Sequence, residues 1–110
     1  MSNERARRFA EYVGLELKGM IASTKGVTAN GVAHTMGRQQ ATFNRWLNGK
    51  SEIPLSVACQ ACEVIGTESK DLVGRAYDRM VAELGEADGD PGLVGEELER
   101  KLRRIRDGRN

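Results

Sequence analysis

The sequence has few of the residues that mark most other classes of protein. Its 110 residues include two cysteines, two prolines, one histidine, two phenylalanines, two tyrosines and one tryptophan. It contains no run of about 18 apolar residues, so it predicts no membrane-spanning helix and no membrane partner. The first residues, MSNERARRFAEYV, have no apolar segment followed by a cleavage site. They do not resemble a secretory signal, and we expect a cytoplasmic protein.

The scarcity of cysteine and histidine bears on metal and catalytic sites. Cys59 and Cys62 form a C-x-x-C pair, but the chain has neither a second such pair nor a histidine pair, so one copy cannot supply four zinc ligands. We interpret both thiols as small buried apolar groups and His34 as a surface residue. The sequence has no nucleophile–histidine–acid set and no phosphate-binding glycine-rich loop. It therefore predicts no enzyme, metal, cofactor or small-molecule ligand.

Helical periodicity is the main signal that is present. Two prolines and little β-branched alternation predict an all-α fold. The expected helices of the first part of the chain cover about residues 4–22, 28–36, 39–48, 54–65 and 67–84. Gly14 and Gly19 in the first of these would allow another helix to approach closely. The inner side of the fourth is predicted to carry Leu55, Ala58, Cys59, Cys62 and Ile65.

The net charge of +1 hides an uneven distribution along the chain. Residues 1–50 hold eight lysines and arginines against three acidic residues. Residues 51–99 hold three against twelve, and residues 100–110 hold six against one. A basic segment is what contact with phosphate requires, so we expect the first half to face a nucleic acid and the acidic middle to face away.

Residues 28–50, TANGVAHTMGRQQATFNRWLNGK, predict two short helices joined by a tight turn. Thr28 can cap the first helix, and Gly37 and Gly49 can end the first and the second. The apolar side of the second helix is formed by Phe43, Trp46 and Leu47. Its opposite side carries Gln40, Ala41, Asn44, Arg45 and Asn48, with no carboxylate. Amides and a guanidinium are the groups that pair with base edges, although they also suit a plain polar surface.

This segment resembles the lambda-repressor/Cro-like (XRE) helix-turn-helix family, over about residues 5–66. The family pattern reads T-x-x-x-L/V-A-x-x-x-G, then a recognition helix ending in N-G-K, then a hydrophobic-Pro-Leu start to the next helix. The matching residues are Thr28, Val32, Ala33, Gly37, Phe43, Arg45, Trp46, Leu47, Asn48, Gly49, Lys50, Ile53, Pro54 and Leu55. Two positions depart from the pattern. Gly31 replaces a better helix former, and Gln39 replaces a capping Ser or Thr.

The resemblance implies a five-helix lambda-repressor-like DNA-binding domain in residues 1–84, whose second helix of the pair enters the major groove. The residues it implies for base reading are Gln40, Ala41, Asn44 and Arg45. Those it implies for phosphate contact are Thr28, Arg38, Gln39, Thr42, Asn48 and Lys50. We therefore expect a sequence-specific transcriptional regulator of phage or bacterial type, most simply a repressor, that binds a double-stranded operator as a homodimer. The alternative is an antitoxin-type or protein-interaction module that retains the fold, with DNA binding secondary or absent.

The end of the chain predicts a linker and an appended helix. Residues 85–92, GEADGDPG, have a linker composition. Residues 93–110 then predict an amphipathic helix, ending near residue 106, with a basic tail. Its apolar stripe, a possible dimer interface, comprises Val94, Leu98, Leu102 and Ile105. A helix of this length is marginal alone in water, so the stripe must pack on something. Pairing in a dimer and folding back on the preceding helix both remain open, with DNA contact third.

Overall fold

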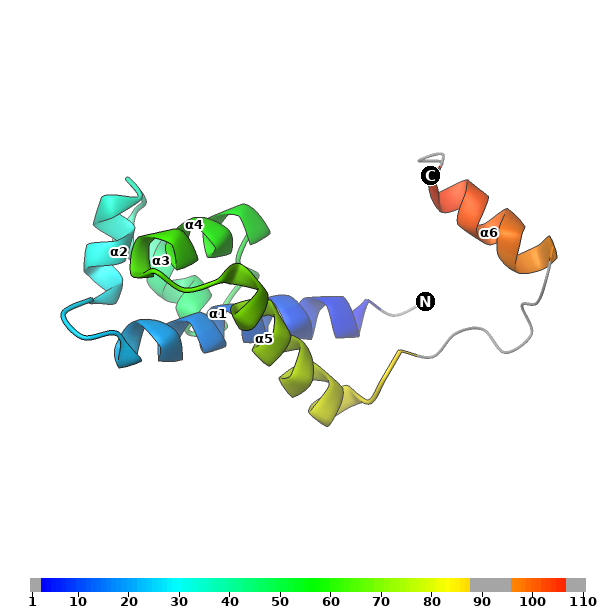
Figure 1. The fold of residues 1–110 in the computed structure, drawn as a ribbon, viewed down its shortest axis with the longest axis horizontal. Coiled ribbons are helices and arrows are strands. Elements are labelled where there is room, and N and C mark those ends of the chain that lie inside the picture. Colours follow the sequence, from blue (N-terminus) through cyan, green and yellow to red (C-terminus); the bar gives the residue numbers. More distant parts are fainter. Residues whose placement is uncertain (1–2, 88–95, 107–110) are drawn as a thin grey trace.

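The protein, seen here as a computed structural model, is described for residues 3–87 and 96–106. These residues form six α-helices and no strand (Figure 1). The helices are α1 (Glu4–Ser23), α2 (Ala29–Thr35), α3 (Gln40–Leu47), α4 (Leu55–Ile65), α5 (Ser69–Leu84) and α6 (Glu96–Arg106). The predicted all-α class is confirmed. None of these helices combines the length and the apolarity that crossing a bilayer would need.

The first five helices share one core around α1, which contacts each of α2, α3, α4 and α5. In Figure 1 the yellow-green α5 crosses beside α1, while α2, α3 and α4 gather over the other end of α1. Each of these five helices contributes to the core a side chain that is no more than 1% exposed: Leu17, Val32, Phe43, Val57 and Leu72. Burial of this apolar surface, at about 25 cal/mol per Å², is the main force holding the five helices together.

A polar cluster joins the first half of α1 to the end of α5. The ring of Tyr12 lies between the guanidinium groups of Arg8 and Arg79, each 4.3 Å from the ring centroid. The Tyr12 hydroxyl donates a hydrogen bond of 2.6 Å to Glu83. Arg8 donates to both oxygens of Glu83, at 2.7 and 3.0 Å, and also forms an ion pair with Glu11. The contacts to Glu83 hold the first half of α1 against the end of α5.

The structure corrects one part of the predicted inner side of α4. Leu55 is 62% exposed, whereas Val57 and Ala61 are buried beside the predicted Ala58 and Cys62. The buried face is rotated toward Val57 and Ala61, which leaves Leu55, in the first turn, at its edge. Both cysteines are free thiols, but only Cys62 is buried and Cys59 is partly exposed, so the prediction of two buried thiols is wrong for Cys59. Burial raises the pKa of the Cys62 thiol.

Helix α6 stands apart from the body in Figure 1 and, within the described ranges, contacts none of the other five helices. Leu102 and Ile105 are 54% and 66% exposed. Of the predicted apolar stripe, Val94 and the side chain of Leu98 lie outside the described residues. The predicted alternative in which this helix packs on α5 is therefore not present in the described part of the chain.

Candidate nucleic-acid interface

The first helix of the pair, α2, begins and ends as its residues predict. The Thr28 hydroxyl accepts a hydrogen bond of 3.0 Å from the backbone N–H of Gly31, which confirms the capping role of Thr28. Gly37 has a φ of 68°, a value that glycine adopts without the strain other residues would meet. The next residue, Arg38, donates its N–H to the carbonyl of Ala33 at 2.8 Å. This hydrogen bond holds the turn between α2 and α3 against the last turn of α2.

The second helix, α3, starts one residue later than predicted. Gln39 has an extended backbone and its side chain caps no backbone N–H of α3, as expected for a residue that is a poor cap. Its side-chain oxygen instead accepts a hydrogen bond of 3.1 Å from the Thr42 hydroxyl. The helix ends at Leu47, and Gly49, with a φ of 69°, turns the chain away.

The predicted division of α3 into an apolar and a polar face is confirmed. Phe43 and Leu47 are 0% and 2% exposed, and Trp46 packs half-buried against the core. On the other side Gln40, Ala41 and Arg45 are exposed and Asn44 is half-buried. Helix α3 contacts α1 and α2 but, in residues 3–87 and 96–106, none of α4, α5 and α6. Apart from Asn44, the side chains of its polar face are therefore left uncovered by the rest of the described chain.

One candidate base-reading side chain is held by the neighbouring helix. The amide nitrogen of Asn44 donates a hydrogen bond of 3.2 Å to the side-chain oxygen of Asn30 in α2. This contact orients the Asn44 amide toward α2. Asn30 was not among the predicted site residues, because no local spacing connects residues that are fourteen positions apart.

Polar groups surround a small pocket at the start of α3. It has a volume of about 300 Å³ and is lined by Gly37, Arg38, Gln39, Thr42 and Trp46. Three of the predicted phosphate contacts, Arg38, Gln39 and Thr42, therefore lie together here. Arg38 is exposed and takes part in no ion pair within the described ranges. An anion at this pocket would meet a guanidinium, a hydroxyl and an amide.

A second group of donors lies at the opposite end of α3. The ammonium group of Lys18 in α1 donates a hydrogen bond of 2.5 Å to the side-chain oxygen of Asn48, and Lys50 is exposed just beyond. Lys18 was not a predicted site residue, because its place beside α3 depends on how α1 packs. One signal was available in the sequence: no acidic residue occurs between Glu16 and Glu52.

The remaining predicted residues are separate from these two groups. Thr28 lies at the start of α2, with its hydroxyl engaged in the cap. His34 is exposed, and no group of three or more His, Cys, Asp or Glu side chains in the described ranges is placed to hold a metal ion. No family model, curated protein or solved structure matches the chain.

Proposed function

We propose that this protein is a sequence-specific DNA-binding transcriptional regulator of the lambda-repressor-like type, with α3 as its recognition helix. The observation that carries the proposal is the polar face of α3. It is uncovered and free of carboxylates, while the opposite face is locked into the core by Phe43 and Leu47. A helix held in this way can enter the major groove without disturbing the fold.

The side chains on this face match the donor and acceptor pattern of base edges. The exposed guanidinium of Arg45 can donate two hydrogen bonds to guanine, and Gln40 can pair with adenine through its amide. Asn44, with its amide held by Asn30, offers a second adenine-type contact. The methyl group of Ala41 is suited to the methyl group of thymine. These four positions, two adjacent pairs about one turn apart on α3, would then read neighbouring base pairs.

We propose that the two donor groups at the ends of α3 contact the two phosphate backbones. Eight residues of helix measure about 12 Å in length, and the major groove is about 12 Å wide. Arg38, Gln39 and Thr42 would contact one backbone, while Lys18, Asn48 and Lys50 would contact the other. Such contacts set register and supply most of the affinity without reading sequence.

A single helix reads only a few base pairs, so we propose that two copies bind half-sites related by a two-fold axis, about one DNA turn apart. Occupation of a promoter by such a dimer would repress transcription by excluding polymerase. The cellular compartment would then be the cytoplasm, where bacterial or phage operators are found.

The proposal is tested by selecting bound sequences from a pool of random DNA duplexes with the full chain. We expect enrichment of one motif, arranged as two inverted half-sites. A pool with no enriched motif, together with no retention on nonspecific DNA or heparin at low salt, would contradict DNA binding. It would favour the second candidate function, a protein-interaction module. The exposed Leu102 and Ile105 of α6 support that candidate, because apolar side chains gathered on one face of a helix can mark an interaction surface.

A further inference from the structure

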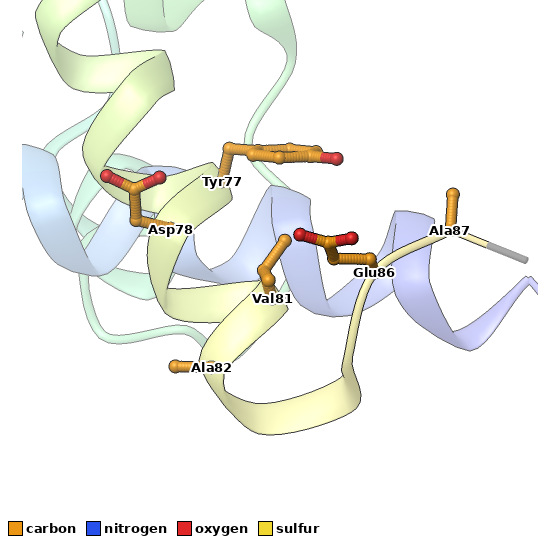
Figure 2. Close-up of a pocket in the computed structure, with 6 residues that line it drawn as sticks. All are labelled: Tyr77, Asp78, Val81, Ala82, Glu86 and Ala87. Atoms are coloured by element: carbon orange, nitrogen blue, oxygen red, sulfur yellow. The ribbon is translucent and has the colours of Figure 1, made fainter.

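The exposed side of α5 carries a hollow that plays no part in the proposed DNA interface. Figure 2 shows Tyr77 and Val81 of α5 on one side of it and Glu86 and Ala87, from the segment after α5, on the other. Its volume is about 460 Å³. Tyr77 is 45% exposed, and its ring is held edge-on against Phe9 of α1, with the ring centroids 6.3 Å apart. One wall of the hollow is therefore an aromatic ring held in place by a second ring.

Helix α6 carries an exposed apolar face that could pack against the apolar side chains of this hollow. Leu102 and Ile105 lie three residues apart, on one side of the helix, and are 54% and 66% exposed. The described part of α6 is 11 residues long, and an isolated helix of that length is marginal in water. Because α6 contacts none of the other described helices, it needs a surface on which to pack.

The charges around the two surfaces are opposite in sign. Asp78 and Glu86 line the hollow, and neither takes part in an ion pair within residues 3–87 and 96–106. Helix residues advance by about 100° each, so Lys101 and Arg106 flank the face formed by Leu102 and Ile105. These two bases are exposed. An α6 seated in the hollow would place bases beside the acidic rim.

We propose that α6 of one chain docks its Leu102 and Ile105 face into the Tyr77–Val81 hollow of a second copy, while the second copy returns the same contact. One docked helix of three turns buries little surface, whereas reciprocal exchange doubles the area toward what a stable dimer requires. Exchange of an identical element is also a common route to two-fold dimers. This inference concerns self-association without DNA, so it can fail or succeed independently of the reading function of α3.

The test uses two charge-reversed versions of the full chain and sedimentation equilibrium. The hollow variant combines Asp78→Lys with Glu86→Lys, and the helix variant combines Lys101→Glu with Arg106→Glu. In either variant alone, like charges meet at both contacts. We expect the dimer dissociation constant to rise at least about tenfold. In an equimolar mixture the reversed hollow meets the reversed helix, and the unchanged helix meets the unchanged hollow. Heterodimers should then form with the affinity of the wild type.

A matched control reverses two exposed acidic residues outside the hollow, Glu52→Lys with Glu63→Lys, and should leave the wild-type dimer intact. Circular dichroism of each variant checks that the body remains folded, as expected for exposed side chains. A monomeric wild type would overturn the proposal. So would a hollow variant that still dimerises, because α6 would then pair elsewhere. A mixture that stays monomeric would also overturn it, because docking would then occur within one chain.

Discussion

Gly14 of α1 lies directly against the main-chain carbonyl of Trp46 in α3. A Cβ added at Gly14 would be 2.0 Å from the Trp46 oxygen and 3.0 Å from its carbonyl carbon. A backbone carbonyl cannot rotate away as a side chain can, so the two helices would have to separate in a closely packed interior. The absence of a side chain at Gly14 therefore sets how closely α3 packs against α1. It also sets how far the polar face of α3 projects from the surface of the domain.

Replacing Gly14 by alanine should destabilise the protein by about 1–3 kcal/mol, the usual cost of overpacking a core. Urea unfolding measures the change. Gly19→Ala is the matched control, because it lies in the same helix and its added Cβ would meet no atom within 4 Å. That variant should gain about 0.5–1 kcal/mol from the better helix propensity of alanine. Equal stabilities for the two variants would show that α1 and α3 do not meet at Gly14.

The Glu83 carboxylate should make stability depend on pH in the acidic range. Hydrogen bonds from Arg8, and then from Tyr12, lower the pKa of Glu83 to about 2 from an ordinary value of 4.5. Because the folded pKa is the lower one, this stabilisation is fully present above 4.5 and is lost as the pH falls toward 2. Thermal melting of Glu83→Gln should therefore show a Tm below that of the wild type near neutral pH, with the difference shrinking through this window.

The control for this experiment is Glu63→Gln, which changes an exposed glutamate of α4 that forms no ion pair in the described ranges. Its Tm should follow that of the wild type across the same pH window. If Glu83→Gln also followed the wild type throughout, the link between α1 and α5 would be absent in solution.

The features of the fold that were predictable depend on neighbours in the sequence. Thr28 caps α2 through a residue three positions away, and Gly37 ends it through its own φ. The polar face of α3 follows from helical spacing alone. Local rules of capping and periodicity are sufficient for such features, because every participant lies within one turn.

The features that could not be predicted join residues far apart in the chain. Arg8 and Glu83 are 75 positions apart, and Lys18 and Asn48 are 30 positions apart. Their pairing depends on which sides of α1 face α5 and α3, and no local pattern encodes that choice. The predicted burial of Leu55 was wrong for a related reason. Which residues form the edge of a buried face depends on where the neighbouring helices end.

Arg45→Ala should reduce binding to the selected operator by about 1–3 kcal/mol and relax one base position, because a bidentate contact to guanine is lost. Fluorescence anisotropy with the operator and with single-base variants measures both effects. Arg75→Ala, which removes an exposed arginine of α5, is the charge-matched control and should bind as the wild type does. Full affinity and unchanged base preference in Arg45→Ala would exclude this residue from base reading.

Lys50→Ala should weaken all duplexes alike, whatever their sequence, because Lys50 is proposed to contact only phosphate. The slope of log binding constant against log salt concentration should become shallower by about 0.9. Titration of operator and of unrelated DNA over a range of salt concentrations measures this change. A loss confined to the operator would instead assign Lys50 to base reading.

Lys18→Ala distinguishes the assembled interface from one confined to the two helices of residues 28–50. Lys18 belongs to α1, yet its ammonium group donates a hydrogen bond to the side chain of Asn48, near Lys50. Lys18 should therefore contribute a phosphate contact of its own. The salt slope should again fall by about 0.9, and the double variant with Lys50→Ala should lose about twice that amount. Lys70→Ala, at an exposed lysine of α5, should leave the slope unchanged. A slope unaffected by Lys18→Ala would place α1 away from the DNA and would require α3 to enter the groove at a different angle.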